Sequence, residues 1–205
     1  MQVPGSSPDV LCDPSGCGGG GGCSGSGHAG YLYPHLLTDG QSATAKIDDV
    51  FDYLNSTGHV AGFVGVGNNT QWSGHGDGSY YIQAGLVDGG GGLLAFIQYD
   101  LNGYVYTPYY AYASSGTNYT ASVTRVSANA WKASINGHSY QITASMTHTD
   151  FDAEGTVSGS NECETMEFQF SSISPWTTST MAPWQFSGPY YVTGITSYGF
   201  TSAGP

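Results

Sequence analysis

The sequence predicts an all-β protein, a two-sheet antiparallel β-sandwich or jelly roll. No stretch of ten or more residues repeats its apolar side chains with the period of a helix. Apolar and polar residues instead alternate over short runs that are separated by turn residues. The 205 residues include 32 glycines and 16 tyrosines, which favours many short strands joined by turns. A chain of this length can form one sandwich domain with a substantial core.

Two regions are expected, a Gly/Ser/Cys-rich amino-terminal arm over residues 1–30 and the β-sandwich domain over 31–205. Glycine at the density of the arm does not hold a regular element without help. The arm carries three cysteines, whose spacing matches no standard zinc site, so we expect disulfides formed in an oxidising compartment. Four candidates allow three connectivities, which the sequence leaves open. The candidates are Cys12, Cys17, Cys23 and Cys163.

The elements follow in chain order. An apolar patch at 31–37 precedes a strand-like segment at 43–47, and residues 48–54 are interpreted as a short helix or an irregular strand. From residue 59 onward the alternation is clear, and Asn102-Gly103 and Asn136-Gly137 predict tight hairpin turns. Strands are expected at 59–67, 79–88, 93–100, 104–112, 121–126, 130–135, 140–146, 162–170 and 184–195.

Charge restricts the possible partners of this chain. Three Lys and Arg stand against 15 Asp and Glu, for a formal net charge of −12. A chain without a basic patch is a poor ligand for nucleic acid, and no apolar run is long enough to insert into a membrane. Few carboxylates can be held in ion pairs, so acid would disrupt few native interactions. The composition fits a protein that works in acid.

The chain is expected to be secreted, although no signal peptide is visible at its amino terminus. Three Asn-x-Ser/Thr sequons give candidate glycosylation sites at Asn55, Asn68 and Asn118. The acidic residues at 48–52 lack the spacing of a calcium loop, and the six histidines are scattered singly. We therefore expect no metal and no cofactor.

The segment 79–88 contains the first candidate functional residue. Tyr80, Ile82 and further alternate residues form one face, and Tyr81, Gln83 and Gly85 form the other. A strand of a sandwich buries one face and can present the second face to a groove. Gln83 is therefore a candidate functional residue, although most polar strand residues are only solvated.

The segment 163–171 supplies a possible chemical partner. Its apolar residues alternate with polar ones, which places Glu167 in mid-strand on the polar face. Glutamate is disfavoured within strands, and all four glutamates of the chain lie between residues 154 and 167. This clustering makes Glu167 a candidate catalytic carboxylate.

Short motifs along 59–195 resemble the eqolisins, secreted glutamic peptidases that act in acid and have a concanavalin-like β-sandwich. In that family a Trp-Val-Gly-Ile strand precedes a Leu-Gln-Thr-Gly strand with the catalytic glutamine, and a later Ala-Glu-aromatic strand bears the catalytic glutamate. The corresponding segments here are Phe-Val-Gly-Val at 63–66, Ile-Gln-Ala-Gly at 82–85, Ala-Phe at 95–96 and Glu-Phe at 167–168. Residues 183–187 are similar to the strand that follows in that family.

The resemblance implies that Gln83 and Glu167 are catalytic and that the substrate is a polypeptide. It also implies substrate contacts by Phe63, Tyr81, Gln98 and Tyr99. A glutamate can deprotonate the attacking water, and a glutamine amide can donate to the developing oxyanion. The chain departs from the family where phenylalanine replaces tryptophan at 63 and where residues 97–101 replace an acidic, aromatic run.

Two other functions are also consistent with the sequence. A non-catalytic extracellular protein, either a carbohydrate-binding module or a surface subunit that self-associates through its amino-terminal arm, would also suit a tyrosine-rich chain with few charges. A glycosidase would need a pair of carboxylates, such as Glu167 with Glu164 or Asp100. Glu164 and Glu167 fall on opposite faces of a regular strand, so they would not pair without a bulge.

Overall fold

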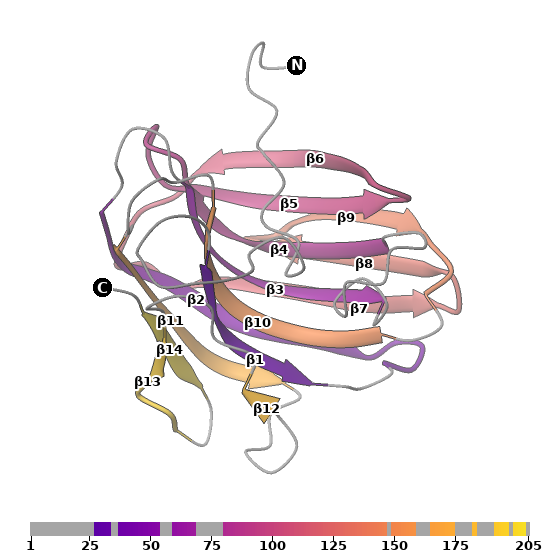
Figure 1. Cartoon of the computed structure of the whole chain (residues 1–205). Coiled ribbons are helices and arrows are strands. Elements are labelled where there is room, and N and C mark those ends of the chain that lie inside the picture. Colours follow the sequence, from indigo (N-terminus) through magenta and orange to yellow (C-terminus); the bar gives the residue numbers. More distant parts are fainter. Residues whose placement is uncertain are drawn as a thin grey trace.

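Two seven-stranded antiparallel sheets stack face to face, which confirms the predicted fold class (Figure 1). The computed structural model describes residues 27–33, 37–53, 59–68, 80–146, 149–158, 165–174, 182–183, 191–196 and 199–203. Every element in these ranges is a β-strand. No helix among them is long and apolar enough to cross a membrane.

Sheet A has the strand order β12-β1-β10-β3-β4-β5-β6. Apart from β12, its strands are seven to ten residues long, and all neighbours pair antiparallel. The strands of sheet A are β1 (Gly27–Tyr33), β3 (His59–Asn68), β4 (Tyr80–Asp88), β5 (Leu94–Leu101), β6 (Tyr104–Tyr112), β10 (Thr149–Ser158) and β12 (Ala182–Pro183).

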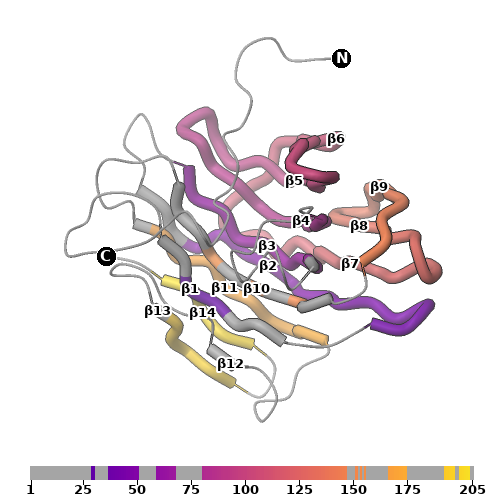
Figure 2. The backbone as a smooth tube through the Cα atoms, turned by 45° about the vertical axis from the view of Figure 1, so that its right-hand side comes forward, coloured from indigo at the N-terminus to yellow at the C-terminus, as the bar shows by residue number. Residues whose placement is uncertain are grey.

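Sheet B has the order β13-β14-β11-β2-β7-β8-β9. It packs on sheet A so that β3 faces β2 and β7, β5 faces β8, and β6 lies over β9 at one margin of the sandwich (Figure 2). The strands of sheet B are β2 (Ser42–Tyr53), β7 (Tyr119–Ser127), β8 (Ala130–Ile135), β9 (His138–Thr143), β11 (Thr165–Ser174), β13 (Tyr191–Thr193) and β14 (Phe200–Ala203).

Both Asn-Gly hairpin turns are confirmed. Asn102 and Gly103 have φ angles of 58° and 82°, and Asn136 and Gly137 have φ angles of 49° and 80°. Positive φ at both central residues is the type I′ geometry, whose twist matches that of the flanking strands. The turns thus fix the registers of β5 with β6 and of β8 with β9.

Several boundaries differ from the sequence prediction. Residues 48–53 continue β2 as a strand, because pairing with β11 overrides the ambiguous local pattern. Strand β10 was not expected, since its Asp, Glu and Gly residues are depleted in strands. Strand β14 was also not expected, and residues 27–30 of the predicted arm lie in β1.

The main core lies between the sheets and is built from the inward residues of both. Trp131, Phe151, Phe168 and Phe170 are among its largest fully buried side chains. Sheet A also has apolar residues on the face that points away from sheet B, which we call the outward face. There Ala61, Phe63, Val87 and Phe96 form a second buried cluster. Sheet A is therefore buried on both faces along β3, β4 and β5.

Gly85 provides a test of the close approach between β3 and β4. A Cβ atom at this position would overlap the carbonyl oxygen of Gly62 and the backbone of Phe63. Gly85→Ala is expected to lower the free energy of unfolding in urea by about 1–3 kcal/mol, because backbone must move to accept the methyl group.

The matched control is Gly91→Ala, since a Cβ atom at Gly91 would meet nothing within 4 Å. That variant is expected to unfold within about 0.5 kcal/mol of the parent. If the two variants had equal free energies of unfolding, the backbones of β3 and β4 would be able to move apart and accept the Gly85→Ala methyl group without loss of stability.

Candidate active site

Gln83 lies on the outward face of sheet A, as its strand pattern predicted. Ile82, Ala84 and Leu86 point into the core, and Tyr81 and Gln83 alternate with them. The expected open groove is not seen at this position, because only 4% of Gln83 is exposed. A buried carboxamide requires hydrogen-bond partners, and β5 supplies one.

Gln98 on β5 is the hydrogen-bond partner of Gln83. The two residues are directly opposite each other in the antiparallel pair, and Gln83 Nε2 donates to Gln98 Oε1 over 2.9 Å. The Tyr81 hydroxyl donates to the same oxygen over 3.0 Å. Gln98 Nε2 in turn donates to Thr107 Oγ1 of β6 over 3.2 Å. We call these four residues the amide network.

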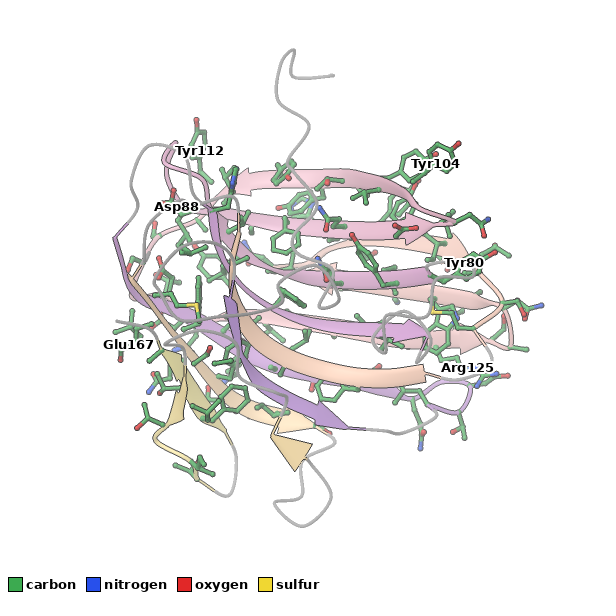
Figure 3. The ribbon with its side chains drawn as sticks, viewed as in Figure 1. Tyr80, Asp88, Tyr104, Tyr112, Arg125 and Glu167 are labelled. Carbon is green, nitrogen blue, oxygen red and sulfur yellow. The ribbon has the colours of Figure 1, made fainter. Side chains whose placement is uncertain are left out.

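Glu167 does not meet Gln83. It lies on β11 of sheet B, where its neighbours Met166 and Phe168 point into the core. Glu167, labelled in Figure 3, is therefore on the face of sheet B that points away from sheet A. Gln83 is on the outward face of sheet A, on the opposite side of the sandwich. The hypothesis that these two residues form a catalytic pair fails, because strand alternation directs them to opposite outer faces.

A different glutamate shares the face of Gln83. On β10, Phe151 and Ala153 are core residues, so positions 152 and 154 belong to the outward face. Glu154 is opposite Phe63 in the register of β10 with β3, and Phe63 belongs to the outward cluster. The structure thus places the Glu154 position on the same sheet and the same face as Gln83.

The registers define the spacing between these positions. Asp152, Gly65, Gln83 and Gln98 form one row across β10, β3, β4 and β5, and Glu154, Phe63, Gly85 and Phe96 form the next. Two strand spacings and two residues separate Glu154 from Gln83, so their Cα atoms lie about 12 Å apart. Gly65 has no side chain, which leaves bare backbone between Gln83 and β10.

The predicted substrate contacts divide into two groups. Phe63, Tyr81 and Gln98 lie on the same outward face as Gln83, and their role as substrate contacts stays a prediction. Tyr99 does not, because it alternates with Gln98 and points between the sheets, so its predicted role in substrate binding is wrong. Its ring stacks on Tyr106, with centroids 5.1 Å apart, and on Tyr140 of sheet B at 5.4 Å.

The remaining candidates are distributed as follows. Asp100 accepts a hydrogen bond from the Gly103 amide at the β5–β6 turn, and it lies in sheet A, so it does not pair with Glu167. Asn118 is exposed before β7, and Asn68 ends β3. In the ranges described, no three His, Cys, Asp or Glu residues gather at a metal-binding distance. Outside those ranges lie Asn55, Glu164 and the four cysteines Cys12, Cys17, Cys23 and Cys163.

Glu154 and Thr107 were missed by the reasoning from sequence. A signal for Glu154 was available, since Ala153-Glu154 matches the Ala-Glu of the family strand, whereas Glu167 follows a methionine. The Glu-Phe pair at 167–168 supplied the aromatic residue and led to the wrong strand. Thr107 had no such signal, because its contact depends on a bulge between the Ile97 and Tyr99 pairs of β5 and β6.

The fold of this chain is similar to that of known peptidases. No family model matches the sequence, and no curated protein matches it. Among solved structures, the chain is similar to scytalido-glutamic peptidase with a peptide-based transition state analogue, at a TM-score of 0.62 and 14% identity, over 88% of this chain and 98% of that chain. It is also similar to SCP-B, a member of the eqolisin family of peptidases in complex with the tripeptide Ala-Ile-His, at a TM-score of 0.56 and 15% identity, over 88% and 98% of the two chains. The chain therefore has the eqolisin fold.

The inward position of Tyr99 gives a testable pH effect. Burial, and next the hydrogen bond and charge of Tyr140, raise the pKa of Tyr99 from 10.0 to about 12. Folding thus favours the neutral phenol, so the stability linked to Tyr99 is present below pH 10 and is lost as pH rises toward 12. We expect the free energy of unfolding in urea of the parent to fall relative to that of Tyr99→Phe as pH rises from 10 toward 12.

Tyr112→Phe is the matched control, since it removes a hydroxyl from an exposed end of β6. If both variants changed with pH in the same way relative to the parent, Tyr99 would not titrate as an inward, buried group.

Proposed function

We propose that this protein is an acid-acting endopeptidase that hydrolyses peptide bonds by direct attack of water. Gln83 stabilises the oxyanion, and Glu154 is the general base and acid. The observation that carries this proposal is the common outward face of sheet A, which holds Gln83 on β4 and the Glu154 position on β10, with β3 between them. The eqolisin fold of the chain supports the same class of reaction.

Glu154 is favoured over the two other carboxylates considered. Glu167 is excluded by its place on the far side of the sandwich. Asp152 shares the row of Gln83 and the outward face of β10, but its side chain is one methylene shorter than that of glutamate. The longer side chain suits a group that must leave room for a water and a peptide carbonyl between itself and Gln83.

The reaction follows from the two functional groups. The Glu154 carboxylate takes a proton from water as the water oxygen bonds to the peptide carbon, and the carbonyl electron pair moves onto oxygen. Gln83 Nε2 donates a hydrogen bond to that oxyanion. Glu154 then returns the proton to the amide nitrogen, the C–N bond breaks, and a carboxylic acid and an amine leave. No cofactor enters this scheme.

Acid conditions suit this chain for two reasons. Three Lys and Arg leave few native ion pairs for protons to break, and in acid these residues, six histidines and the amino terminus supply only a modest positive charge. The carboxylate of Glu154 must be ionised to accept a proton, so its pKa sets the lower pH limit of activity.

The test is cleavage of casein between pH 2 and 5 by the parent and by single variants. Gln83→Ala is expected to lower kcat by about 10²–10³-fold, the usual loss for an oxyanion donor. Glu154→Gln should abolish activity, and Asp152→Asn should have the smaller effect.

Glu167→Gln is the matched control, because it makes the same change on the opposite face of the sandwich. Circular dichroism must show an intact fold for each variant. Full activity of Glu154→Gln, or loss of activity in Glu167→Gln alone, would overturn this assignment of the catalytic carboxylate.

A second candidate function is supported by exposed tyrosines on both faces of β6 and on β9, at the margin where β6 lies over β9. These two strands contain no Lys, Arg, Asp or Glu, and Tyr104 and Tyr112 point away from the two ends of β6 (Figure 3). Exposed aromatic side chains without neighbouring charges form a surface suited to binding a ligand, and we take a sugar polymer as the candidate. The exposed tyrosines of this margin are Tyr104, Tyr106, Tyr110, Tyr112 and Tyr140.

Binding to insoluble cellulose and chitin tests this second function. The double change Tyr104→Ala and Tyr112→Ala is expected to reduce retention at least tenfold, with Val50→Ala and Val126→Ala as an exposed control. If the parent binds neither polymer, the sugar-binding function is wrong. If it also cleaves casein, the peptidase function is supported.

A further inference from the structure

The hydrogen bonds around Gln98 run in one consistent direction. Gln98 Oε1 accepts from both Tyr81 and Gln83, and Gln98 Nε2 donates to Thr107. Tyr81, Gln83 and Gln98 are all nearly fully buried, so water does not readily replace these contacts. The orientation of one carboxamide therefore determines the orientation of the next.

Two arrangements of such an amide pair are possible in principle. In the first arrangement the Gln98 oxygen faces Gln83, and one N–H of the Gln83 amide donates to it. The second N–H of Gln83 and the Gln83 Oε1 oxygen make no hydrogen bond to Gln98. With Gln98 reversed, its nitrogen would face Gln83, and Gln83 would have to reverse as well. The structure has the first arrangement.

We propose that Gln98 is a positioning residue that fixes the Gln83 carboxamide in the orientation needed for peptide hydrolysis, with Thr107 holding Gln98. This inference rests on the proposed function. In this orientation Gln83 offers one N–H to an oxyanion and its carbonyl oxygen to the attacking water. Gln98 itself touches no reacting atom.

Residue 98 is an amide and not a carboxylate, and this difference adds one contact to the network. A carboxylate would also accept from Gln83 and Tyr81, but it has no N–H to donate to Thr107. The neutral amide adds the contact with β6 and avoids placing another charge beside Gln83. An amide and a carboxylate both offer an acceptor oxygen to Gln83, whereas only the amide can also donate to Thr107.

Kinetics of casein-derived peptide cleavage by four variants test the proposal. Gln98→Met removes the acceptor at similar length and is expected to lower kcat about 10–100-fold while KM changes less than about threefold, because orientation rather than binding is lost. Gln98→Glu restores an acceptor and should recover at least a third of the parental kcat. Thr107→Val should lower kcat by a smaller factor than Gln98→Met does. Thr107→Ser keeps the hydroxyl and should leave kcat unchanged.

A second readout does not depend on activity. In ¹⁵N-labelled protein, the side-chain amide protons of Gln83 are expected to exchange slowly with solvent in the parent. Exchange should accelerate at least tenfold in Gln98→Met and in Thr107→Val, and should return to the parental rate in Thr107→Ser. Thr107 is only partly buried, so its variants provide this test even if Gln98→Met does not fold.

Gln169→Met is the matched control, since it makes the same change at an exposed position of β11 on the far side of the sandwich. A parent that cleaves no peptide overturns the proposed function and, with it, the catalytic role of Gln98. If the parent cleaves peptides, and if Gln98→Met and Thr107→Val both keep the parental kcat and the parental Gln83 exchange rate, the positioning role alone is overturned. A uniform fall in kcat and rise in KM across all four variants would also overturn it, as general loosening of the site.

Discussion

Phe168 packs directly on the backbone of Gly62, and this contact between β11 and β3 joins the inward faces of the two sheets. A Cβ atom at Gly62 would lie 2.5 Å from Cδ1 of the phenylalanine, so no larger residue fits without a shift. Once Phe168 points inward, strand alternation turns Glu167 outward from sheet B. The same contact leaves Phe63, next to Gly62, on the outward face of sheet A.

The candidate site depends on both faces of sheet A being packed. The inward residues of β4 contribute to the main core, and the outward residues hold the amide network beside a small apolar cluster. A buried carboxamide that lacks a partner is costly, and this cost makes the direction of each hydrogen bond in the network specific. Gly85 lets the backbones of β3 and β4 approach closely beside the network, since a Cβ atom there would overlap Gly62 and Phe63.

The sequence was informative where the pattern was local. Asn-Gly pairs predicted the type I′ turns, and clean alternation predicted β3 to β8 and the outward position of Gln83. Prediction failed where local preference and strand pairing disagreed. Strand β10 is rich in residues that disfavour strands, but it pairs with β1 on one side and β3 on the other. Because β10 was not expected, Glu154 was not considered, and Glu167 was chosen.

Local sequence pattern is enough to predict the fold class, the alternation of each clear strand, and a glutamine on the face of β4 that the main core does not use. These properties depend on neighbours along the chain, through the two-residue period of a strand and the φ angles of turns. The tertiary structure alone decided which glutamate shares that face, and that Gln98 and Thr107 anchor Gln83. Such relations depend on sheet order and register, which bring together residues that are distant in the chain and that no local pattern connects.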